Sequence, residues 1–581
     1  MSIKKLLVAI NAKYIHSNLA VYSLKSYCER EPYNIENIHI AEYTINNRVE
    51  EIIDDIYISK PDVIAFSCYI WNIEYVTKII VELNKLLPHS HIWLGGPEVS
   101  YNTDYYLDKY TFIKGILVGE GEETFSELIT EYDRVKLDGD ESMENIHRIA
   151  GIVTHHKRVA GERQSVDMST IPFPYKELSS FENRIIYYES SRGCPYSCSY
   201  CLSCIDKKLR FRDISLVKQE LGFFIENNVR QVKFIDRTFN SDRKRAVDIW
   251  KYILENDNGI TNFHFEIASD LLDDAQIEVL KSMRTGLVQL EIGVQSTNES
   301  TLAAIRRKMD IPKLKESVDK LKEKGNIHIH LDLIAGLPYE DLASFKKSFN
   351  EVYSMKPDEL QLGFLKVLYG AYMYEDAKKY NIVYKSYPPY EVLHTQWLSY
   401  DDVLELKSVE EVLEIYYGSG QFVYSIRYIE SFFETPYDFY KMLGRFYLKN
   451  HACGTKHSRI ERYSILLDFA THYNKELDIN ENVLRELVTL DIYLRENIKS
   501  RPIFLMSLDG CRDQIKEIAR CNNISKSHHI EIFSKETVIY AKEVFCCDEK
   551  DVIENIIFVG FDYDNRNPIT HNAHVYVLKK C

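Results

Sequence analysis

Four of the twelve cysteines of this 581-residue chain lie within eleven residues, at positions 194, 198, 201 and 204. Cys194, Cys198 and Cys201 have the spacing C-x3-C-x2-C, in the segment Ser-Arg-Gly-Cys-Pro-Tyr-Ser-Cys-Ser-Tyr-Cys that directly follows a predicted strand. Three thiolates on one tight loop can converge on a single iron–sulfur cluster and leave one iron without a protein ligand. The sequence therefore predicts a cluster whose open iron can bind a chelating molecule.

Two other kinds of metal site fit part of this pattern. Zinc sites usually pair C-x2-C knuckles across a longer loop, so zinc fits the spacing poorly. A four-cysteine electron-transfer cluster with Cys204 as its fourth ligand fits better, but it leaves the surrounding strand pattern unexplained. We expect Cys204 to be a neighbour of the cluster and not a ligand, because a fourth ligand would close the open iron.

The cysteine loop belongs to a region in which strands and helices alternate regularly. A helical pattern follows each of the first five of six predicted strands, at residues 185–189, 231–235, 262–267, 287–293, 328–334 and 359–363. This spacing predicts a (β/α)6 barrel or partial barrel with its active residues at the C-terminal ends of the strands.

A second alternating region precedes the barrel. Short β-branched runs alternate with amphipathic stretches, and the predicted strands are residues 6–10, 35–40, 63–67, 92–94 and 115–118. Such alternation predicts a Rossmann-like, doubly wound parallel sheet covered by helices on both faces. Its ligand would bind outside the carboxyl ends of the strands.

Changes in composition divide the chain into four parts. Residues 1–135 hold the first sheet, 136–178 form a charged linker with room for one hairpin, 179–370 form the barrel and 371–581 form a further domain. The last part has helical periodicity over 400–473 and becomes β-like over 530–579. The predicted class is α/β with a mainly helical C-terminal domain that contains some β-structure.

Composition excludes several classes of protein. With 72 Lys and Arg against 87 Asp and Glu, the net charge of −15 argues against binding nucleic acid through bulk charge. The first apolar run ends at Asn11, too short for a signal peptide or a membrane span. We therefore expect a cytoplasmic protein, in which cysteines serve metal or redox chemistry before disulfides.

The cysteine loop after the first barrel strand, with Tyr200 directly before Cys201, resembles that of the radical S-adenosylmethionine (SAM) enzymes. The resemblance implies that Cys194, Cys198 and Cys201 hold a [4Fe-4S] cluster. It also implies that the amine and carboxylate of SAM occupy the open iron.

The same resemblance implies five SAM-binding residues. Asp236 and Thr238 follow the second strand, where the family contacts the methionine moiety. Glu291 and Gln295 lie on the fourth strand, where the family contacts the ribose and carboxylate, and Asp332 begins a segment that lies near the adenine. For residues at strand ends, capping of the following helix is the alternative.

The first sheet carries a second resemblance. Leu-Gly-Gly-Pro-Glu at 94–98 is a turn whose glycines allow close approach of the backbone to a ligand. Before a radical SAM core it resembles the cobalamin (B12)-binding domain, in which Gly95 and Gly96 match a glycine pair and Ser67 matches a serine after the third strand. Val-Gly-Glu-Gly-Glu at 118–122 is also typical of these fused proteins.

The sequence departs from the cobalamin mutases in the segment that supplies their histidine ligand to cobalt. The Asp-x-His-x-x-Gly motif of cobalamin mutases is absent, because residues 11–18 read Asn-Ala-Lys-Tyr-Ile-His-Ser-Asn. We expect cobalamin without a histidine ligand from that motif, and which of His16, Tyr14 or Trp71 lies over the lower corrin face stays open. A nucleotide-binding or structural Rossmann-like layer is the alternative, although no G-x-G-x-x-G follows the first strand.

The resemblance implies an enzyme that reductively cleaves SAM to a 5′-deoxyadenosyl radical and C-methylates an unactivated carbon. Its partners would be a reductant such as flavodoxin or ferredoxin and an unknown small-molecule or peptide substrate. Rearrangement or cyclisation without methyl transfer, methylthio transfer to RNA, and a non-enzymatic electron-transfer or cobalamin-carrier protein remain alternatives. Methylthio transfer is disfavoured because its N-terminal domain normally carries three cysteines, and here that region has only Cys28 and Cys68.

The C-terminal domain resembles an uncharacterised domain that often follows these modules, with Gln-Trp-Leu-Ser-Tyr at 396–400 as one matching stretch. Its six cysteines show no cluster spacing and are interpreted as packing thiols, at positions 453, 511, 521, 546, 547 and 581.

Overall fold

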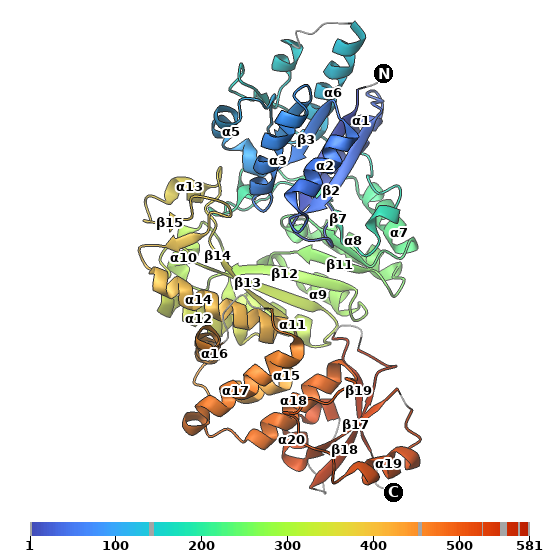
Figure 1. The fold of residues 1–581 in the computed structure, drawn as a ribbon, viewed down its shortest axis with the longest axis vertical. Helices are drawn as coiled ribbons and strands as arrows, with labels where there is room; N and C mark the ends of the chain where they lie inside the picture. Colours follow the sequence, from blue (N-terminus) through green and yellow to red (C-terminus); the bar gives the residue numbers. More distant parts are fainter. Residues whose placement is uncertain are drawn as a thin grey trace. The chain divides into compact units, whose positions relative to one another are not determined.

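The computed structural model describes residues 3–138, 144–450, 456–525, 527–545, 555–567 and 570–578. The chain divides into two compact units (Figure 1). The first comprises Met1–Ile292, Ser300–Ile327 and Phe364–Gln396, and the second comprises Gly293–Glu299, His328–Gly363 and Trp397–Cys581. Within the described ranges, no helix is long and apolar enough to cross a lipid bilayer.

The first unit begins with a six-stranded sheet in the order β2-β1-β3-β4-β5-β6, drawn in blue in Figure 1. Its strands are β1 (Lys5–Asn11), β2 (Ile38–Thr44), β3 (Val63–Ser67), β4 (His91–Gly95), β5 (Gly115–Leu117) and β6 (Ile152–Val153). The first five are parallel, and β6 runs antiparallel to β5. The predicted Rossmann-like parallel sheet is confirmed.

Helices cover both faces of this sheet because its strands are apolar on both sides. Val8 of β1 packs with Ile79 on one face, and the adjacent Leu7 packs with Phe125 on the other. The helices are α1 (Leu19–Glu29), α2 (Val49–Ser59), α3 (Ile73–Leu86), α4 (Pro97–Ser100), α5 (Thr103–Lys109) and α6 (Gly121–Asp138).

Two elements differ from the sequence prediction. The second strand begins at Ile38 and not at residue 35, because Asn37 has a left-handed backbone with φ of 61° that interrupts an extended run. The segment 136–178, expected as a linker, contributes η1 (Glu144–Arg148) and the edge strand β6. Pairing of β6 with β5 joins segments distant in sequence, so local patterns do not reveal it.

All six predicted barrel strands form. They are β7 (Ile186–Tyr188), β10 (Gln231–Phe234), β11 (Asn262–Glu266), β12 (Val288–Gln295), β13 (His328–Ala335) and β14 (Glu359–Phe364). In the first unit, β7, β10, β11 and β12 pair in this order and in parallel. In the second unit, β13 and β14 are neighbours.

Aspartate side chains define where the barrel helices begin. Five helices are each preceded by an aspartate whose carboxylate accepts a backbone N–H of the first turn, at positions 213, 242, 273, 310 and 341. These helices are α7 (Ile214–Glu226), α8 (Arg243–Glu255), α9 (Asp274–Lys281), α11 (Ile311–Lys322) and α12 (Leu342–Tyr353), while α10 (Glu299–Ala304) is shorter.

Barrel strands alternate between polar and apolar side chains. On β10 the partly exposed Lys233 lies between the buried Val232 and Phe234, and on β11 His264 lies between two buried phenylalanines. Parallel strands that are packed on both faces are normally apolar throughout. The alternation therefore indicates that one face of these strands is turned to a polar interior.

The first unit also contains several short elements. They are η2 (Met168–Thr170), η3 (Ser179–Phe181), η5 (Phe239–Ser241), η6 (Ser269–Leu271), α13 (Tyr372–Asp376), β15 (Val383–Tyr384) and β16 (Val392–His394).

The rest of the second unit is mainly helical and ends in a small sheet (Figure 1, orange and red), as predicted. Its helices are α14 (Tyr400–Leu413), the π-helical η7 (Glu414–Gly418), α15 (Val423–Glu430), α16 (Pro436–Asn450), α17 (Arg459–Leu477), α18 (Glu481–Arg495), α19 (Arg512–Cys521), α20 (Lys535–Tyr540) and α21 (Lys542–Phe545). The antiparallel strands are β17 (His529–Ser534), β18 (Ile556–Asp562) and β19 (His574–Leu578). Ile518 of α19 packs against this sheet.

A buried carboxyl group follows β13 in the second unit. Glu340 is 1% exposed, and its Oε1 accepts hydrogen bonds from Ser296 Oγ at 2.6 Å and Ser348 Oγ at 3.1 Å. Burial raises the pKa of Glu340 to about 7, although the two hydroxyl donors act in the opposite direction. The folded protein therefore holds this proton at a pH where the unfolded chain releases it.

We predict that Glu340 makes the folding of this unit less favourable as the pH rises. Because the folded-state pKa is above the unfolded value, its contribution is fully present below about pH 4.5 and is lost as the pH passes about 7, a loss of about 3 kcal/mol. Glu340→Gln should flatten this decrease between about pH 5 and pH 8.5, measured by chemical denaturation at several pH values. Glu434→Gln, at an exposed position, is the control and should keep the wild-type slope. An unchanged slope in Glu340→Gln would contradict the assignment.

Candidate cofactor site

The three cysteines of the C-x3-C-x2-C motif lie on a loop whose two ends are joined by a short hairpin. β8 (Ser191–Arg192) pairs antiparallel with β9 (Arg210–Phe211), and the cysteines lie between these strands. Gly193 has φ of 90°, and a Cβ at this position would come 2.5 Å from the Lys208 carbonyl oxygen. The hairpin therefore needs glycine immediately before the first cysteine.

Each of the three thiols has a polar group beside its sulfur. The distances are 3.7 Å from Cys194 Sγ to Thr238 Oγ1, 3.5 Å from Cys198 Sγ to Arg307 Nη1 and 3.4 Å from Cys201 Sγ to the Ser203 N–H. None of the three is in a disulfide, and the first two are buried. Hydrogen-bond donors and a guanidinium stabilise thiolates, which are the form that binds iron–sulfur clusters. The donor set thus fits a cluster with three protein ligands.

A cavity of about 830 Å³ lies in the first unit, beside the cysteine loop. On one side it is lined by the carboxyl ends of β1, β3, β4 and β5, including Ser67, Gly95 and Gly96. On the other side it is lined by barrel residues and by Arg192 and Leu202 of the cysteine loop. Its volume is at the upper end of the range for cofactor pockets. All three predicted cobalamin residues therefore lie along one cavity that also reaches the cysteine loop.

Gly95 and Gly96, in the turn that ends β4, have different roles. Gly96 has φ of 111°, and a Cβ there would come 2.5 Å from the Cys68 carbonyl oxygen, so the turn itself requires glycine. A Cβ on Gly95 would make only ordinary contact, 3.5 Å from Leu117 Cβ. The close backbone approach at Gly96 is thus between two segments of the chain, while Gly95 leaves space at the cavity wall.

We predict that Gly96→Ala destabilises the protein by at least about 2 kcal/mol, through backbone strain and steric overlap. The matched variant Gly95→Ala should change stability by less than about 1 kcal/mol, and both are measured by chemical denaturation. Gly95→Ala should retain less hydroxocobalamin after desalting, read as corrin absorbance, because its methyl group adds bulk to the cavity wall. Equal stability of the two variants would contradict this distinction.

The three candidates for the lower corrin face lie in different places. His16 and Trp71 line the cavity, whereas Tyr14 is 70% exposed and does not. His16 Nδ1 lies 2.7 Å from Tyr187 OH, and burial together with the nearby Lys13 ammonium lowers the pKa of His16. Trp71 Nε1 donates to the Ile10 carbonyl oxygen at 3.2 Å, which holds the indole at the end of β1.

Asp236 is buried behind the start of the cysteine loop. Its Oδ2 accepts the Ser190 N–H at 2.9 Å, and its Oδ1 accepts the hydroxyl groups of Ser190, at 2.7 Å, and Ser191. Burial raises the pKa of this carboxyl, although the three hydrogen bonds oppose the rise. Contact with SAM stays a prediction for Asp236, and the geometry shows a group that fixes the β7–β8 junction.

Glu291 forms a charged group with two side chains that sequence reasoning missed. Lys233 Nζ and His264 Nε2 each lie 3.0 Å from Glu291 Oε2. Burial alone would raise the pKa of Glu291, but the hydrogen bond from His264 and the Lys233 charge lower it to about 2. The signal in the sequence was the alternation of polar and apolar residues in β10 and β11, which places Lys233 and His264 between buried apolar side chains.

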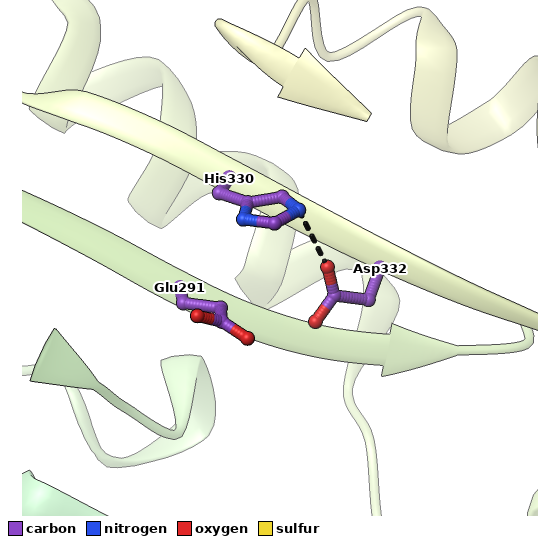
Figure 2. A group of neighbouring side chains, drawn as sticks. All are labelled: Glu291, His330 and Asp332. Atoms are coloured by element: carbon purple, nitrogen blue, oxygen red, sulfur yellow. Dashed lines mark ion pairs between the residues drawn. The ribbon is translucent and has the colours of Figure 1, made fainter. Parts of the chain in front are cut away.

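In the second unit, Gln295 is buried at the end of β12, and Asp332 is half-buried on β13. Gln295 is 9% exposed, has φ of 73°, and its Oε1 has no hydrogen-bond partner among the described residues. Such a buried polar atom fits a ligand that supplies the missing donor. Asp332 Oδ1 lies 2.8 Å from His330 Nε2 on the same strand, as Figure 2 shows.

Some predictions fall outside the described side chains. These are the expectations for Cys204, Cys453, Cys546, Cys547 and Cys581. The interpretation of Cys521 as a packing thiol is wrong, because this cysteine is exposed and disulfide-bonded, whereas Cys511 is a half-buried free thiol. Arg307, beside Cys198, was missed because no spacing in the sequence connects it with the cysteine motif.

The three-cysteine loop and the adjoining cavity fit a protein that holds an iron–sulfur cluster beside a second cofactor. Three family models match the chain: "B12 binding domain" over residues 5–129, "Radical SAM superfamily" over 188–352 and "Protein of unknown function (DUF4080)" over 378–574. The chain therefore contains a B12-binding domain, a radical SAM domain and an uncharacterised C-terminal domain. The cofactors of these families are a [4Fe-4S] cluster, SAM and cobalamin, as expected from the sequence.

Two curated relatives are methyltransferases. The chain is 27% identical over 356 residues to the 2-(S-pantetheinyl)-carbapenam-3-carboxylate methyltransferase of Streptantibioticus cattleyicolor, and 26% identical over 320 residues to the cobalamin-dependent radical SAM methyltransferase TokK of Streptomyces tokunonensis. The alignments cover 56% and 51% of this chain but 49% and 45% of the relatives. The chain thus spans about half the length of these relatives.

Solved structures share the fold. The cobalamin-dependent SAM radical enzyme OxsB, with aqua-cobalamin and SAM bound, matches with a TM-score of 0.59 and 14% identity over 90% of this chain and 82% of that chain. The radical SAM methyltransferase TsrM from Kitasatospora setae, with cobalamin and a [4Fe-4S] cluster bound, matches with a TM-score of 0.53 and 15% identity over 66% of this chain and 76% of that chain.

Proposed function

We propose that this chain is a cobalamin-dependent radical SAM methyltransferase that methylates an unactivated carbon of a small molecule or peptide. One observation carries the proposal: a single cavity is lined both by the carboxyl edge of the B12-binding sheet and by the loop that bears the three cysteines. A cofactor in this cavity would lie beside the cluster loop. The methyltransferase names of the two curated relatives support the same reaction class.

In this proposal Cys194, Cys198 and Cys201 ligate three irons, and the donors beside their sulfurs stabilise the thiolates. Ser67 and Gly95 face the cobalamin. When bound, the cluster and SAM would supply a 5′-deoxyadenosyl radical after reduction by a flavodoxin or ferredoxin, and cobalamin would supply the methyl group.

We also propose SAM-directed roles for five residues. In the first unit, Thr238 lies beside Cys194, Glu291 is held by Lys233 and His264, and Asp236 holds the serines that begin the loop. In the second unit, Gln295 Oε1 has no hydrogen-bond partner among the described residues, and Asp332 lies beside His330 on β13.

We predict that Cys198→Ala abolishes 5′-deoxyadenosine formation, because its sulfur is one of only three ligands in the proposed site. The assay is anaerobic incubation of reconstituted protein with SAM and a reductant, followed by chromatography. Cys511→Ala is the matched control, since Cys511 is a half-buried free thiol in the C-terminal domain, and this variant should keep wild-type product formation. Undiminished 5′-deoxyadenosine from Cys198→Ala would rule out the cluster assignment.

Methyl transfer is distinguished from its alternatives by isotope labelling. We expect cells that carry the gene, fed methionine with a trideuterated methyl group, to contain a metabolite that carries the whole label and is absent from cells without the gene. A gene-dependent metabolite without the label would favour rearrangement or cyclisation. Gene-dependent label in bulk RNA would favour methylthio transfer.

A further inference from the structure

Two arginines of the β8–β9 hairpin contact two glutamates of the B12-binding domain, all within the first unit. Arg192 Nη2 lies 2.6 Å from Glu122 Oε1, and Arg192 Nη1 lies 3.7 Å from Glu120 Oε1. Arg210 Nη1 donates to Glu120 Oε2 at 3.2 Å, and its Nη2 contacts Oε1 of the same carboxylate. We name these four residues the arginine clasp.

The hairpin register explains why the two guanidinium groups act together. Arg192 and Arg210 are direct partners in the β8–β9 pairing, so their side chains leave the same face of the hairpin. Like charges directly opposite each other destabilise a strand pair. Glu189 beside Arg192 and Asp206 beside Arg210 offset part of this repulsion. Glu120 and Glu122 offset the rest, so the hairpin that closes the cysteine loop depends in part on the B12-binding domain.

The glutamates are themselves fixed by the start of α6. They belong to the segment Val-Gly-Glu-Gly-Glu at 118–122, which leads from β5 into this helix. Glu122 lies in the first helical turn, where a carboxylate is favoured by the helix dipole, and accepts a hydrogen bond from Ser23 Oγ at 3.1 Å. Glu122 is 4% exposed, so loss of its arginine would leave a buried charge unpaired.

The clasp also forms part of the cavity wall. Glu120, Glu122 and Arg192 all line the cavity, and Cys194 follows Arg192 by two residues. The same side chains thus contact the space for one cofactor and hold the loop for the other.

We propose that the arginine clasp couples occupation of the cobalamin cavity to ordering of the cysteine loop, so that cobalamin and the cluster promote each other's binding. The inference rests on the proposed cofactor assignment. Because linkage is reciprocal, the factor by which the cluster strengthens cobalamin binding equals the factor by which cobalamin strengthens cluster binding.

The contact itself is tested first, on the full chain without added cofactor, by hydrogen–deuterium exchange of peptides that cover residues 193–209. Arg192→Gln and Glu122→Gln should each speed this exchange by about tenfold, and the double variant should be no faster than either. Arg192→Lys, which keeps the charge but not the guanidinium fork, should be intermediate. Arg163→Gln is the control, because Arg163 pairs with Glu123 and Glu127 on α6 and should leave the loop unchanged.

The coupling is tested by titrating hydroxocobalamin into the full chain with and without reconstituted cluster. We expect the cluster to lower the wild-type Kd by about tenfold and to leave the Kd of Arg192→Gln unchanged. Additive effects in the exchange experiment, or equal coupling in both proteins, would overturn the proposal. If wild-type protein binds hydroxocobalamin equally well with and without the cluster, the coupling role of the arginine clasp is wrong and the cobalamin assignment stands. If it does not bind hydroxocobalamin at all, both the cobalamin assignment and the coupling are wrong.

Discussion

The convergence of three thiols on one short loop is the constraint on which the rest of the site depends. The loop between β8 and β9 is held by contacts at its two ends and, between them, by backbone hydrogen bonds of Ser199 with Ile305 and Met373. Asp236 binds the serines before it, Gly193 allows the sharp turn into it, and the Arg192–Arg210 pair holds it closed. Asp236 and the two serines are buried, where unsatisfied polar groups are costly and satisfied ones therefore specify a single geometry. Arg192 and Arg210 remain partly exposed.

Charge inside the first unit is balanced in small groups. Glu291 pairs with both Lys233 and His264, and Glu122 pairs with Arg192. A buried ion pair stabilises a protein little compared with an apolar contact, so such pairs are better understood as positioning devices. Lys233, Glu122 and Arg192 from these pairs line the cofactor cavity.

The packing of Cys28 and Cys68 decides whether these two N-terminal cysteines could hold a second iron–sulfur cluster together. Cys68 belongs to the apolar cluster on one face of the first sheet, and Cys28 belongs to the cluster on the other face. Both are fully buried, and burial raises the pKa of the Cys28 thiol to about 12. Two inert thiols on opposite sides of a sheet cannot share an iron–sulfur cluster, so the described part of this domain lacks the auxiliary site that methylthio transfer to RNA would need.

The sequence by itself determined the cysteine loop, the five parallel strands of the first sheet and the six strands of the barrel, because ligand spacing and hydrophobic periodicity are local properties. It placed Ser67, Gly95 and Gly96 at strand ends that prove to line one cavity. Only the tertiary structure decided the start of β2 at Ile38, the pairing of β6 with β5, the approach of Arg307 to Cys198 and the clasp of Arg192 with Glu122. These features join residues far apart in the chain or depend on one backbone angle, and their free energy comes from burial and charge pairing that no local pattern of residue types contains.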